Sequence, residues 1–155
     1  MNDKELMQRA IQRSVQNIDN GGGPFGAVIV KDGEIIAEAG NSVTNTNDPT
    51  AHAEVNAIRM ATKKLGTYDL SGCVIYSSCE PCPMCLGAIY WARLDRLYFA
   101  GTKTDAQDAG FDDSFIYDEL ELDYTKRKLH TEHIMRDEAL AAFNKWKQFE
   151  GKEEY

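Results

Sequence analysis

Four residues of the chain are of types that bind a transition metal or move protons, and they fall in two short segments. His52 and Glu54 lie in the first segment, and Cys82 and Cys85 lie in the second. One nitrogen and two sulfurs are typical ligands of Zn²⁺, and three protein ligands leave the fourth tetrahedral position open to water. The residue types and spacing therefore predict a catalytic zinc site with His52, Cys82 and Cys85 as ligands.

Glu54 is the residue that we expect to move protons at this site. Zn²⁺ with two thiolates and a neutral imidazole carries no net charge, so it is a weaker Lewis acid than a three-histidine zinc site. A neighbouring carboxylate can accept a proton from the water and pass it to the substrate. The alternative is a closed structural site, in which Cys79 is a fourth ligand and the protein is a zinc-stabilised binding module.

The first of the two segments is predicted to lie near the start of a helix. Asp48 is a favourable N-cap and Pro49 a favourable first helical residue, so we expect a helix over residues 49–65. His52 and Glu54 would be about 200° apart around a regular helix. They can serve one site only if the metal lies beyond the N-terminal end of that helix.

The second segment also marks a helix start. Pro81 and Pro83 are typical of a first helical turn, and the helix is expected to run to about Ala92. Cys82 and Cys85 would then lie about 60° apart around the axis, so both sulfurs can reach one ion. The positive end of the helix also favours the thiolate form that a metal ligand requires.

The remaining hydrophobic patterns predict an α/β protein with a mixed sheet. Asp32-Gly33 between two apolar runs predicts an antiparallel hairpin, and a later strand, helix, strand order favours a parallel pair. Helices are expected over 3–20, 49–65, 81–92, 114–120 and 137–149, and strands over 25–30, 34–38, 73–77, 96–100 and 129–135.

Composition narrows the class of protein and of partner. The 155 residues are 43% hydrophobic and carry a net charge of −8, which is typical of a soluble globular domain and argues against a nucleic-acid partner. No apolar run is long enough for a membrane span, and no export signal is recognised, so we expect a cytoplasmic protein. All four cysteines lie between Cys73 and Cys85, which favours metal binding over a disulfide framework.

The motif His-x-Glu followed by Pro-Cys-x-x-Cys is similar to the signature of zinc nucleobase deaminases. Over nearly its whole length the chain resembles bacterial guanine deaminases of the cytidine/deoxycytidylate deaminase-like zinc hydrolase family. Residues 22–30, 47–54, 87–92 and 109–115 carry this resemblance. The Ala-Gly-Phe-Asp-Asp-Ser-Phe stretch at 109–115 and the Glu-Glu-Tyr ending point to guanine.

The resemblance implies a fold and an assembly. It implies one zinc-dependent deaminase domain over residues 1–155, built as a three-layer α/β/α sandwich with a mixed central sheet of about five strands. It also implies a homodimer with one Zn²⁺ per subunit, in which the C-terminal helix and tail, residues 136–155, can exchange between subunits.

The resemblance also implies a reaction, the hydrolysis of guanine to xanthine and ammonia. Zinc-bound hydroxide attacks C2 while Glu54 protonates N3 and then carries a proton to the leaving amine. The implied substrate contacts are Phe25 on the ring, the Asn41 amide and Ala53 backbone N–H on the base, Trp91 at the pocket wall, Asp113 on ring N–H groups, and Tyr155 from the tail.

Alternatives remain open at this level. A tRNA adenosine deaminase shares much of the motif spacing, although the acidic charge argues against it, and cytosine or another free base is also a candidate substrate. On the residues alone, Phe25 and Trp91 are core aromatics, Asn41 shapes a loop, and Asp113 and its neighbour Asp112 are helix caps.

Overall fold

A computed structural model describes residues 1–155 and divides into two compact units, residues 1–114 and 115–155. The first unit is built on a four-stranded mixed sheet. The strands have the order β2-β1-β3-β4. Their bounds are β1 Gly26–Lys31, β2 Glu34–Gly40, β3 Cys73–Cys79 and β4 Arg96–Gly101. Strand β1 is antiparallel to both β2 and β3, and β3 and β4 are parallel. The antiparallel hairpin and the parallel pair agree with the prediction from the sequence.

Both faces of the sheet are buried at strand β1, whereas the edge strand β4 is largely exposed. In β1, Ala27 and Ile29 belong to one cluster of buried residues, and the alternating Val28 and Val30 belong to another. This alternation follows from the two-residue period of a strand. Helices must therefore cover both faces of the sheet.

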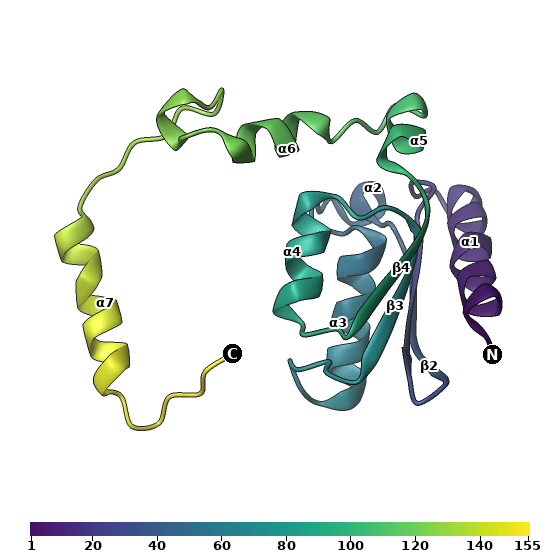
Figure 1. Cartoon of the computed structure of the whole chain (residues 1–155), viewed down its shortest axis with the longest axis horizontal. Coiled ribbons are helices and arrows are strands. Elements are labelled where there is room, and N and C mark those ends of the chain that lie inside the picture. The colour runs from purple at the N-terminus through teal and green to yellow at the C-terminus, as the bar shows by residue number, and fades with distance from the viewer. The chain divides into compact units, whose positions relative to one another are not determined.

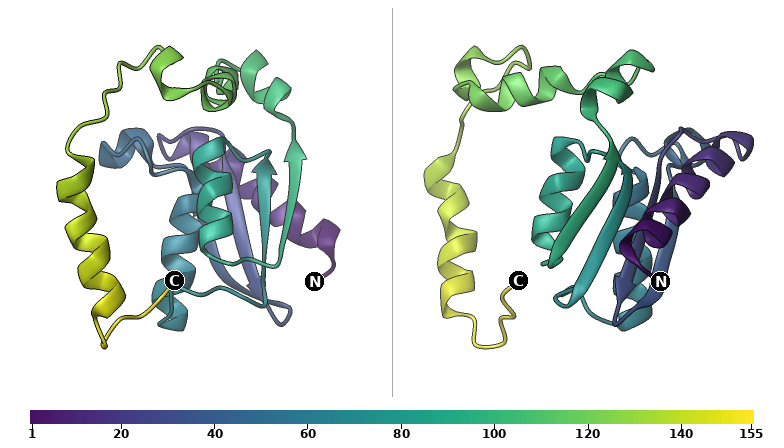
Figure 2. Two further views of the ribbon diagram at one scale, coloured as in Figure 1. Left: turned by 60° about the vertical axis from the view of Figure 1, so that its left-hand side comes forward. Right: turned by 45° about the vertical axis from the view of Figure 1, so that its right-hand side comes forward.

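The helices of the first unit are α1 Asp3–Asp19, α2 Val43–Thr46, α3 Ala53–Leu65, α4 Pro83–Trp91 and α5 Lys103–Asp108. Three of these helices cover the sheet in two layers, with α1 on one face and α3 and α4 on the other (Figure 1). Helix α1 packs on one face through Leu6 and Ala10, while α3 and α4 pack on the other (Figure 2). The predicted three-layer α/β/α architecture is confirmed.

The number of strands differs from the prediction. Residues 129–135 form no strand, so the sheet has four strands rather than about five. That segment has exposed apolar residues, including Leu129 and Ile134, and neither lies in a buried cluster. A run of apolar and β-branched residues forms a strand only where a sheet edge supplies hydrogen bonds and a buried face.

Helices α2 and α5 are short and lie in segments rich in turn residues. Helix α2 was not predicted, whereas α5 lies in a segment, residues 102–113, whose sequence is compatible with a loop or a broken helix. The buried side of α1 does not include all of its apolar residues. Leu6, Ala10 and Asn17 are buried there, whereas Val15 and Ile18 are exposed.

The second unit, residues 115–155, contains all but the first residue of helix α6 (Ser114–Glu121). It also contains the 3₁₀ turn η1 (Tyr124–Lys126) and helix α7 (Arg136–Gln148). The predicted helices 114–120 and 137–149 are confirmed within one residue at each end. The guanidinium of Arg127 donates to the backbone carbonyls of Glu119 (3.0 Å) and Leu122 (3.2 Å), which secures the end of α6. None of the helices in the structure combines the length and apolar composition of a membrane span.

Candidate active site

Cys82 and Cys85 lie in the first turn of α4. Cys82 is the N-cap residue of this helix, and Pro83 occupies the first helical turn, where its missing N–H costs nothing. The backbone N–H of Cys85 donates to the Sγ of Cys82 over 3.5 Å. Both sulfurs therefore lie at the positive end of the α4 dipole, which stabilises negative charge on them.

His52 precedes helix α3 and does not lie within it. It is the N-cap residue, with an extended backbone (φ −70°, ψ 157°), and the helix begins at Ala53. The expected helix start at Pro49 is therefore wrong. Because His52 lies outside the helix, the angular separation that a regular helix would impose on His52 and Glu54 does not apply, and both can serve one site.

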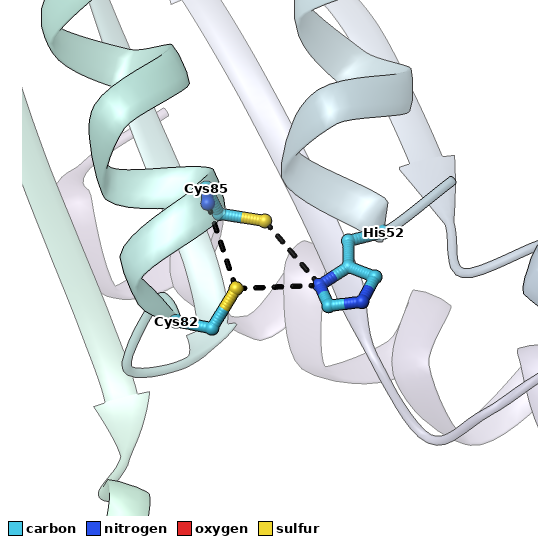
Figure 3. A group of neighbouring side chains, drawn as sticks. All are labelled: His52, Cys82 and Cys85. Carbon is cyan, nitrogen blue, oxygen red and sulfur yellow. Dashed lines mark hydrogen bonds between the residues drawn. The ribbon is translucent and has the colours of Figure 1, made fainter. Parts of the chain in front are cut away.

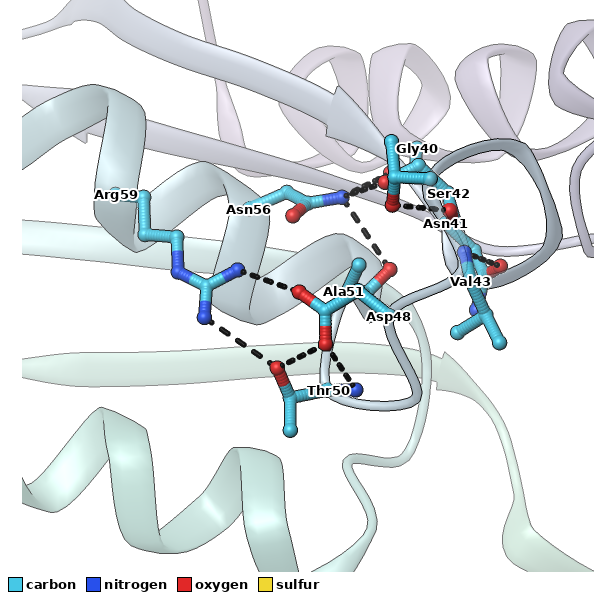
Figure 4. Close-up of polar contacts among 10 residues, drawn as sticks. Gly40, Asn41, Ser42, Val43, Asp48, Thr50, Ala51, Asn56 and Arg59 are labelled. Atoms are coloured by element: carbon cyan, nitrogen blue, oxygen red, sulfur yellow. Dashed lines mark hydrogen bonds and ion pairs between the residues drawn. The ribbon is translucent and has the colours of Figure 1, made fainter.

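A polar network explains why the helix begins late (Figure 4). Asp48 accepts hydrogen bonds from the backbone N–H (2.9 Å) and hydroxyl (2.7 Å) of Thr50, and Arg59 of α3 binds both residues. The Thr50 hydroxyl, its backbone N–H and the Arg59 cation hold the pKa of Asp48 below its usual value. The side chain of Asp48 thus caps a turn, which directs His52 toward α4.

The three predicted ligands converge (Figure 3). The Nδ1 of His52 lies 3.5 Å from the Sγ of Cys82 and 3.5 Å from the Sγ of Cys85, and all three ligand atoms lie within 4.8 Å of one another. In a tetrahedral zinc site, bond lengths of about 2.0 Å to nitrogen and 2.3 Å to sulfur separate these atoms by about 3.6 Å. The donor set and its spacing fit Zn²⁺ with no rearrangement of the backbone.

The electrostatics of the group also suit a cation. The Cys85 thiol and the His52 ring stabilise the Cys82 thiolate and lower its pKa to about 4. The hydrogen bond to Cys82 raises the pKa of His52, and the adjacent Cys82 thiolate raises the pKa of Cys85. The three side chains therefore share protons at short range, and a divalent cation can take the place of those protons.

Glu54 lies beside this group in the first turn of α3. Only 5% of the residue is exposed, and burial raises the pKa of its carboxyl group. Its carboxylate is within hydrogen-bonding reach of the Cys85 side chain. Burial of this carboxyl group beside the metal-binding group, with its pKa raised, suits it to exchange protons as general acid–base chemistry requires.

Cys79 is not part of the metal-binding group. Its thiol donates to the backbone carbonyl of Thr102 over 3.7 Å, and burial raises its pKa to about 11, so the sulfur is a protonated thiol. The geometry brings together one nitrogen and two sulfurs and leaves the Cys₃His alternative without its fourth ligand. A metal bound here retains an open coordination position.

A family model, the cytidine and deoxycytidylate deaminase zinc-binding region, matches residues 1–101. The chain belongs to this deaminase family. The match includes both segments of the metal-binding group and every strand of the sheet. The predicted zinc cofactor is therefore confirmed at the level of the family.

Individual relatives of the deaminase differ in how much of the chain they match. Guanine deaminase of Bacillus subtilis is 53% identical over 100% of both chains, and its crystal structure superposes with a TM-score of 0.98 over 100% of this chain and 99% of that one. A tRNA-specific adenosine deaminase of Aquifex aeolicus is 41% identical over 64% of this chain and 66% of its own length. A structure of guanine deaminase from Nitrosomonas europaea is 34% identical, with a TM-score of 0.70, over 72% of this chain and 65% of that chain.

Two of the predicted substrate contacts, Phe25 and Asn41, lie side by side in the deaminase. The backbone N–H of Asn41 donates to the carbonyl of Phe25 over 3.2 Å, and a Cβ built on Gly23 would contact both side chains at 3.4 Å. The Asn41 Oδ1 accepts from the backbone N–H of Val43 (3.2 Å), which leaves the Nδ2 hydrogens to donate. Phe25 also stands edge-on to Phe111, with 5.0 Å between ring centroids.

Asp113 and Ala53 are also near the metal-binding group. Burial raises the pKa of Asp113, and its charge contributes to the raised pKa of His52, so the two groups interact. The capping role falls to Asp112, which accepts from the Ser114 N–H over 2.9 Å. Ala53 is the first residue of α3, where backbone N–H groups have no intrahelical acceptor.

The two remaining predicted contacts, Trp91 and Tyr155, are not placed beside the metal-binding group by the first unit. Trp91 is the last residue of α4, about 13 Å along the helix from Cys82, and 63% of it is exposed. Arg93 lies over its ring at 5.7 Å. Tyr155 belongs to the second unit. The roles of both residues remain predictions.

Sequence reasoning missed two amides that support the site. Asn56 of α3 donates to the Gly40 carbonyl (2.9 Å), the Ser42 hydroxyl (3.0 Å) and the Ala51 carbonyl (3.3 Å), as Figure 4 shows. Asn17 of α1 is buried and bonds to two loops. A sequence signal existed for Asn17, because a polar residue on the buried side of a helix needs hydrogen-bond partners.

Proposed function

We propose that the protein is a zinc-dependent guanine deaminase of the cytoplasm, which hydrolyses guanine to xanthine and ammonia. The observation that carries this proposal is the 53% identity to the Bacillus guanine deaminase over the whole of both chains. That match includes residues beyond 101, where the family model ends. The match to the Aquifex tRNA deaminase covers only 64% of this chain, and the net charge of −8 disfavours an RNA substrate.

Glu54 is the proposed proton carrier of the reaction. His52, Cys82 and Cys85 would hold the zinc, which would supply Lewis acidity to a water in the site. Glu54 accepts a proton from this water as the oxygen bonds to C2 of guanine, and it delivers that proton to N3. It then moves the remaining hydroxyl proton to the amino group, the C2–N bond breaks, and ammonia leaves as xanthine forms. The geometry supports this role because Glu54 is buried beside the metal-binding group.

The remaining residues of the proposed site bind and orient the base. Phe25 stacks on or near the ring, supported by its edge-on neighbour Phe111. The Asn41 amide and the backbone N–H of Ala53 donate to acceptors of the base. Asp113 accepts from ring N–H groups, and its position within electrostatic reach of His52 is consistent with that role.

The proposed assembly is a homodimer with one Zn²⁺ per subunit. The C-terminal helix and tail, residues 136–155, close over an active site and bring Tyr155 to the base, with Trp91 at the pocket wall. The exposed aromatic side chains of α7, Phe143 and Trp146, are consistent with a segment that is buried on assembly. Sedimentation of the full chain, compared with a chain ending at residue 135, tests this assembly.

The activity is tested by ammonia release from the zinc-loaded protein. The substrates are guanine, adenine, cytosine and an adenosine-containing RNA stem-loop at matched concentration, and the proposal expects release from guanine. Release from the stem-loop alone, with steep salt dependence, would instead identify a tRNA deaminase. Release from none of them would contradict the enzymatic function.

A matched substitution tests the proton carrier. Glu54→Gln keeps the shape of the side chain but removes its ability to carry a proton, so kcat should fall by about 10²–10⁴-fold. Metal analysis should still find one zinc per chain. Full activity in this variant would contradict the proposed mechanism.

A further inference from the structure

A buried amide at the end of α1 joins the two loops that carry Phe25 and Asn41. Only 4% of Asn17 is exposed. Its Nδ2 donates to the Gly23 carbonyl over 2.7 Å and to the Asn41 carbonyl over 2.8 Å, so both amide hydrogens are used. These partners lie six and 24 residues away in the sequence, and a local role in the helix does not explain them.

The two loops and Asn17 form a closed ring of hydrogen bonds. Asn17 donates to Gly23 and to Asn41, the backbone N–H of Phe25 donates to the Gly23 carbonyl (2.8 Å), and the backbone N–H of Asn41 donates to the Phe25 carbonyl (3.2 Å). A closed ring determines the relative placement of its members more tightly than any single bond. The ring therefore sets where Phe25 stands relative to Asn41.

Two glycines make room for this amide. A Cβ on Gly40 would overlap the Asn17 side chain, with only 2.5 Å to its Cγ. A Cβ on Gly22 would overlap the Asn17 Nδ2 and the Asn41 carbonyl oxygen. Glycine at both positions therefore leaves the space that the Asn17 side chain occupies.

The backbone placement of Asn41 is transmitted to its side chain. The Oδ1 of Asn41 is held by the Val43 N–H, so the direction of the Nδ2 hydrogens depends on where the backbone of residues 41–43 lies. Asn56 of α3 binds the adjacent Gly40 carbonyl (2.9 Å), and Asn17 of α1 binds the Asn41 carbonyl. The strand end is thus held from helices on both faces of the sheet.

We infer that Asn17 is a positioning residue for the substrate: it acts through the Gly23 and Asn41 carbonyls to set the base-binding positions of Phe25 and Asn41. This inference rests on the proposed function, because Phe25 and Asn41 are proposed contacts of the base. Asn17 itself does not touch the reacting atoms. Its loss should weaken binding of the base while the zinc ligands and Glu54 continue to act.

Steady-state kinetics of the zinc-loaded full chain test the inference. Asn17→Ala should raise the KM for guanine about tenfold, because a misplaced donor weakens one or two hydrogen bonds to the base, and should change kcat less than about threefold. The matched control is Leu6→Ala on the same helix, a residue that is 3% exposed and packs with Val28, Val30 and Tyr76. This control destabilises the protein without touching either loop, so its KM should be unchanged.

A double substitution separates positioning from general damage. Asn41→Ala removes one of the two side chains through which Asn17 acts but retains the carbonyl that Asn17 binds. Adding Asn17→Ala in that background should raise the KM by clearly less than tenfold, because only the placement of Phe25 is then left to lose and coupled residues are not additive. A full tenfold effect in both backgrounds, or an equal KM increase in Leu6→Ala, would overturn the positioning role.

The outcomes also separate this inference from the proposed function. Ammonia release from guanine with an unchanged KM in Asn17→Ala overturns only the positioning role. Absence of release from every base in the unaltered protein overturns both. Amide hydrogen exchange at Asn41 supplies a readout without substrate, since loss of the ring should speed exchange of its N–H in Asn17→Ala and not in Leu6→Ala.

Discussion

The space around Gly40 leads to a quantitative prediction for Gly40→Ala. Gly40 is the last residue of β2, and an added Cβ would overlap the Asn17 side chain, with 2.5 Å to its Cγ. Backbone pairing across β1 and β2 places Gly40 opposite Gly26, so the strand end cannot shift freely. The Asn17 side chain must therefore move and give up its two hydrogen bonds.

The size of the effect follows from those two bonds. Each buried hydrogen bond contributes about 1 kcal/mol, and leaving a buried carbonyl unsatisfied adds a desolvation cost, so the free energy of unfolding should fall by about 2–4 kcal/mol. For a chain of 155 residues, this corresponds to a drop in Tm of about 4–16 °C. Either quantity is well above experimental error.

Thermal and urea unfolding, followed by circular dichroism, measure this change. The matched control is Gly87→Ala, in the middle of α4, where an added Cβ meets nothing within 4 Å. Alanine is favoured over glycine inside a helix by about 0.5–1 kcal/mol, so this control should be slightly stabilised. The two glycine-to-alanine changes should thus have opposite signs.

An equal stability for Gly40→Ala and the unaltered protein would refute this reasoning. It would mean that the strand end has room for a methyl group and that Asn17 is not held there. The same result would also remove the structural basis of the positioning role, because the ring of hydrogen bonds depends on that close approach.

Three further predictions follow from the metal-binding group, the core and the buried tyrosine. Cobalt-substituted protein should show a thiolate-to-metal absorption band with the intensity of two sulfur ligands. Cys79→Ser should leave this band unchanged, and Cys85→Ser should diminish it. A chelator should abolish activity until Zn²⁺ is restored. A band that Cys79→Ser also weakens would indicate a closed site. Ile75→Ala, at a position with 0% exposure in the central strand β3, should lower the free energy of unfolding by about 2–5 kcal/mol in urea denaturation. Burial and a 2.7 Å hydrogen bond to Asp3 raise the pKa of Tyr76, so an alkaline titration at 295 nm should show a late phenol ionisation that is absent in Tyr76→Phe. Because the folded-state pKa is the higher one, stability should fall as pH rises above about 10, and this fall should be smaller in Tyr76→Phe.

Local sequence patterns predicted most of the elements. Pro83 in the first turn of α4 and the Asp32-Gly33 turn, with φ values of 49° and 79°, act through backbone restrictions that do not depend on the rest of the fold. The metal ligands were predictable for a similar reason. His52, Cys82 and Cys85 are of types that Zn²⁺ prefers, and the spacing of the cysteines on one helix turn brings their sulfurs together.

Tertiary structure decided the features that depend on distant partners. The start of α3 moved from Pro49 to Ala53 because Asp48 binds Thr50 and Arg59 instead of capping a helix. The absence of a strand over 129–135 could not be predicted from residue types, because a strand needs a neighbouring edge and a buried face.

The same distinction applies to the site. The sequence by itself determined which side chains could hold zinc and carry protons, because ligand preference and acidity are properties of residue types. Only the tertiary structure showed that Asn17 bridges the loops of Phe25 and Asn41. Such a contact joins residues far apart in the chain, and its energy depends on burial, which no local pattern encodes.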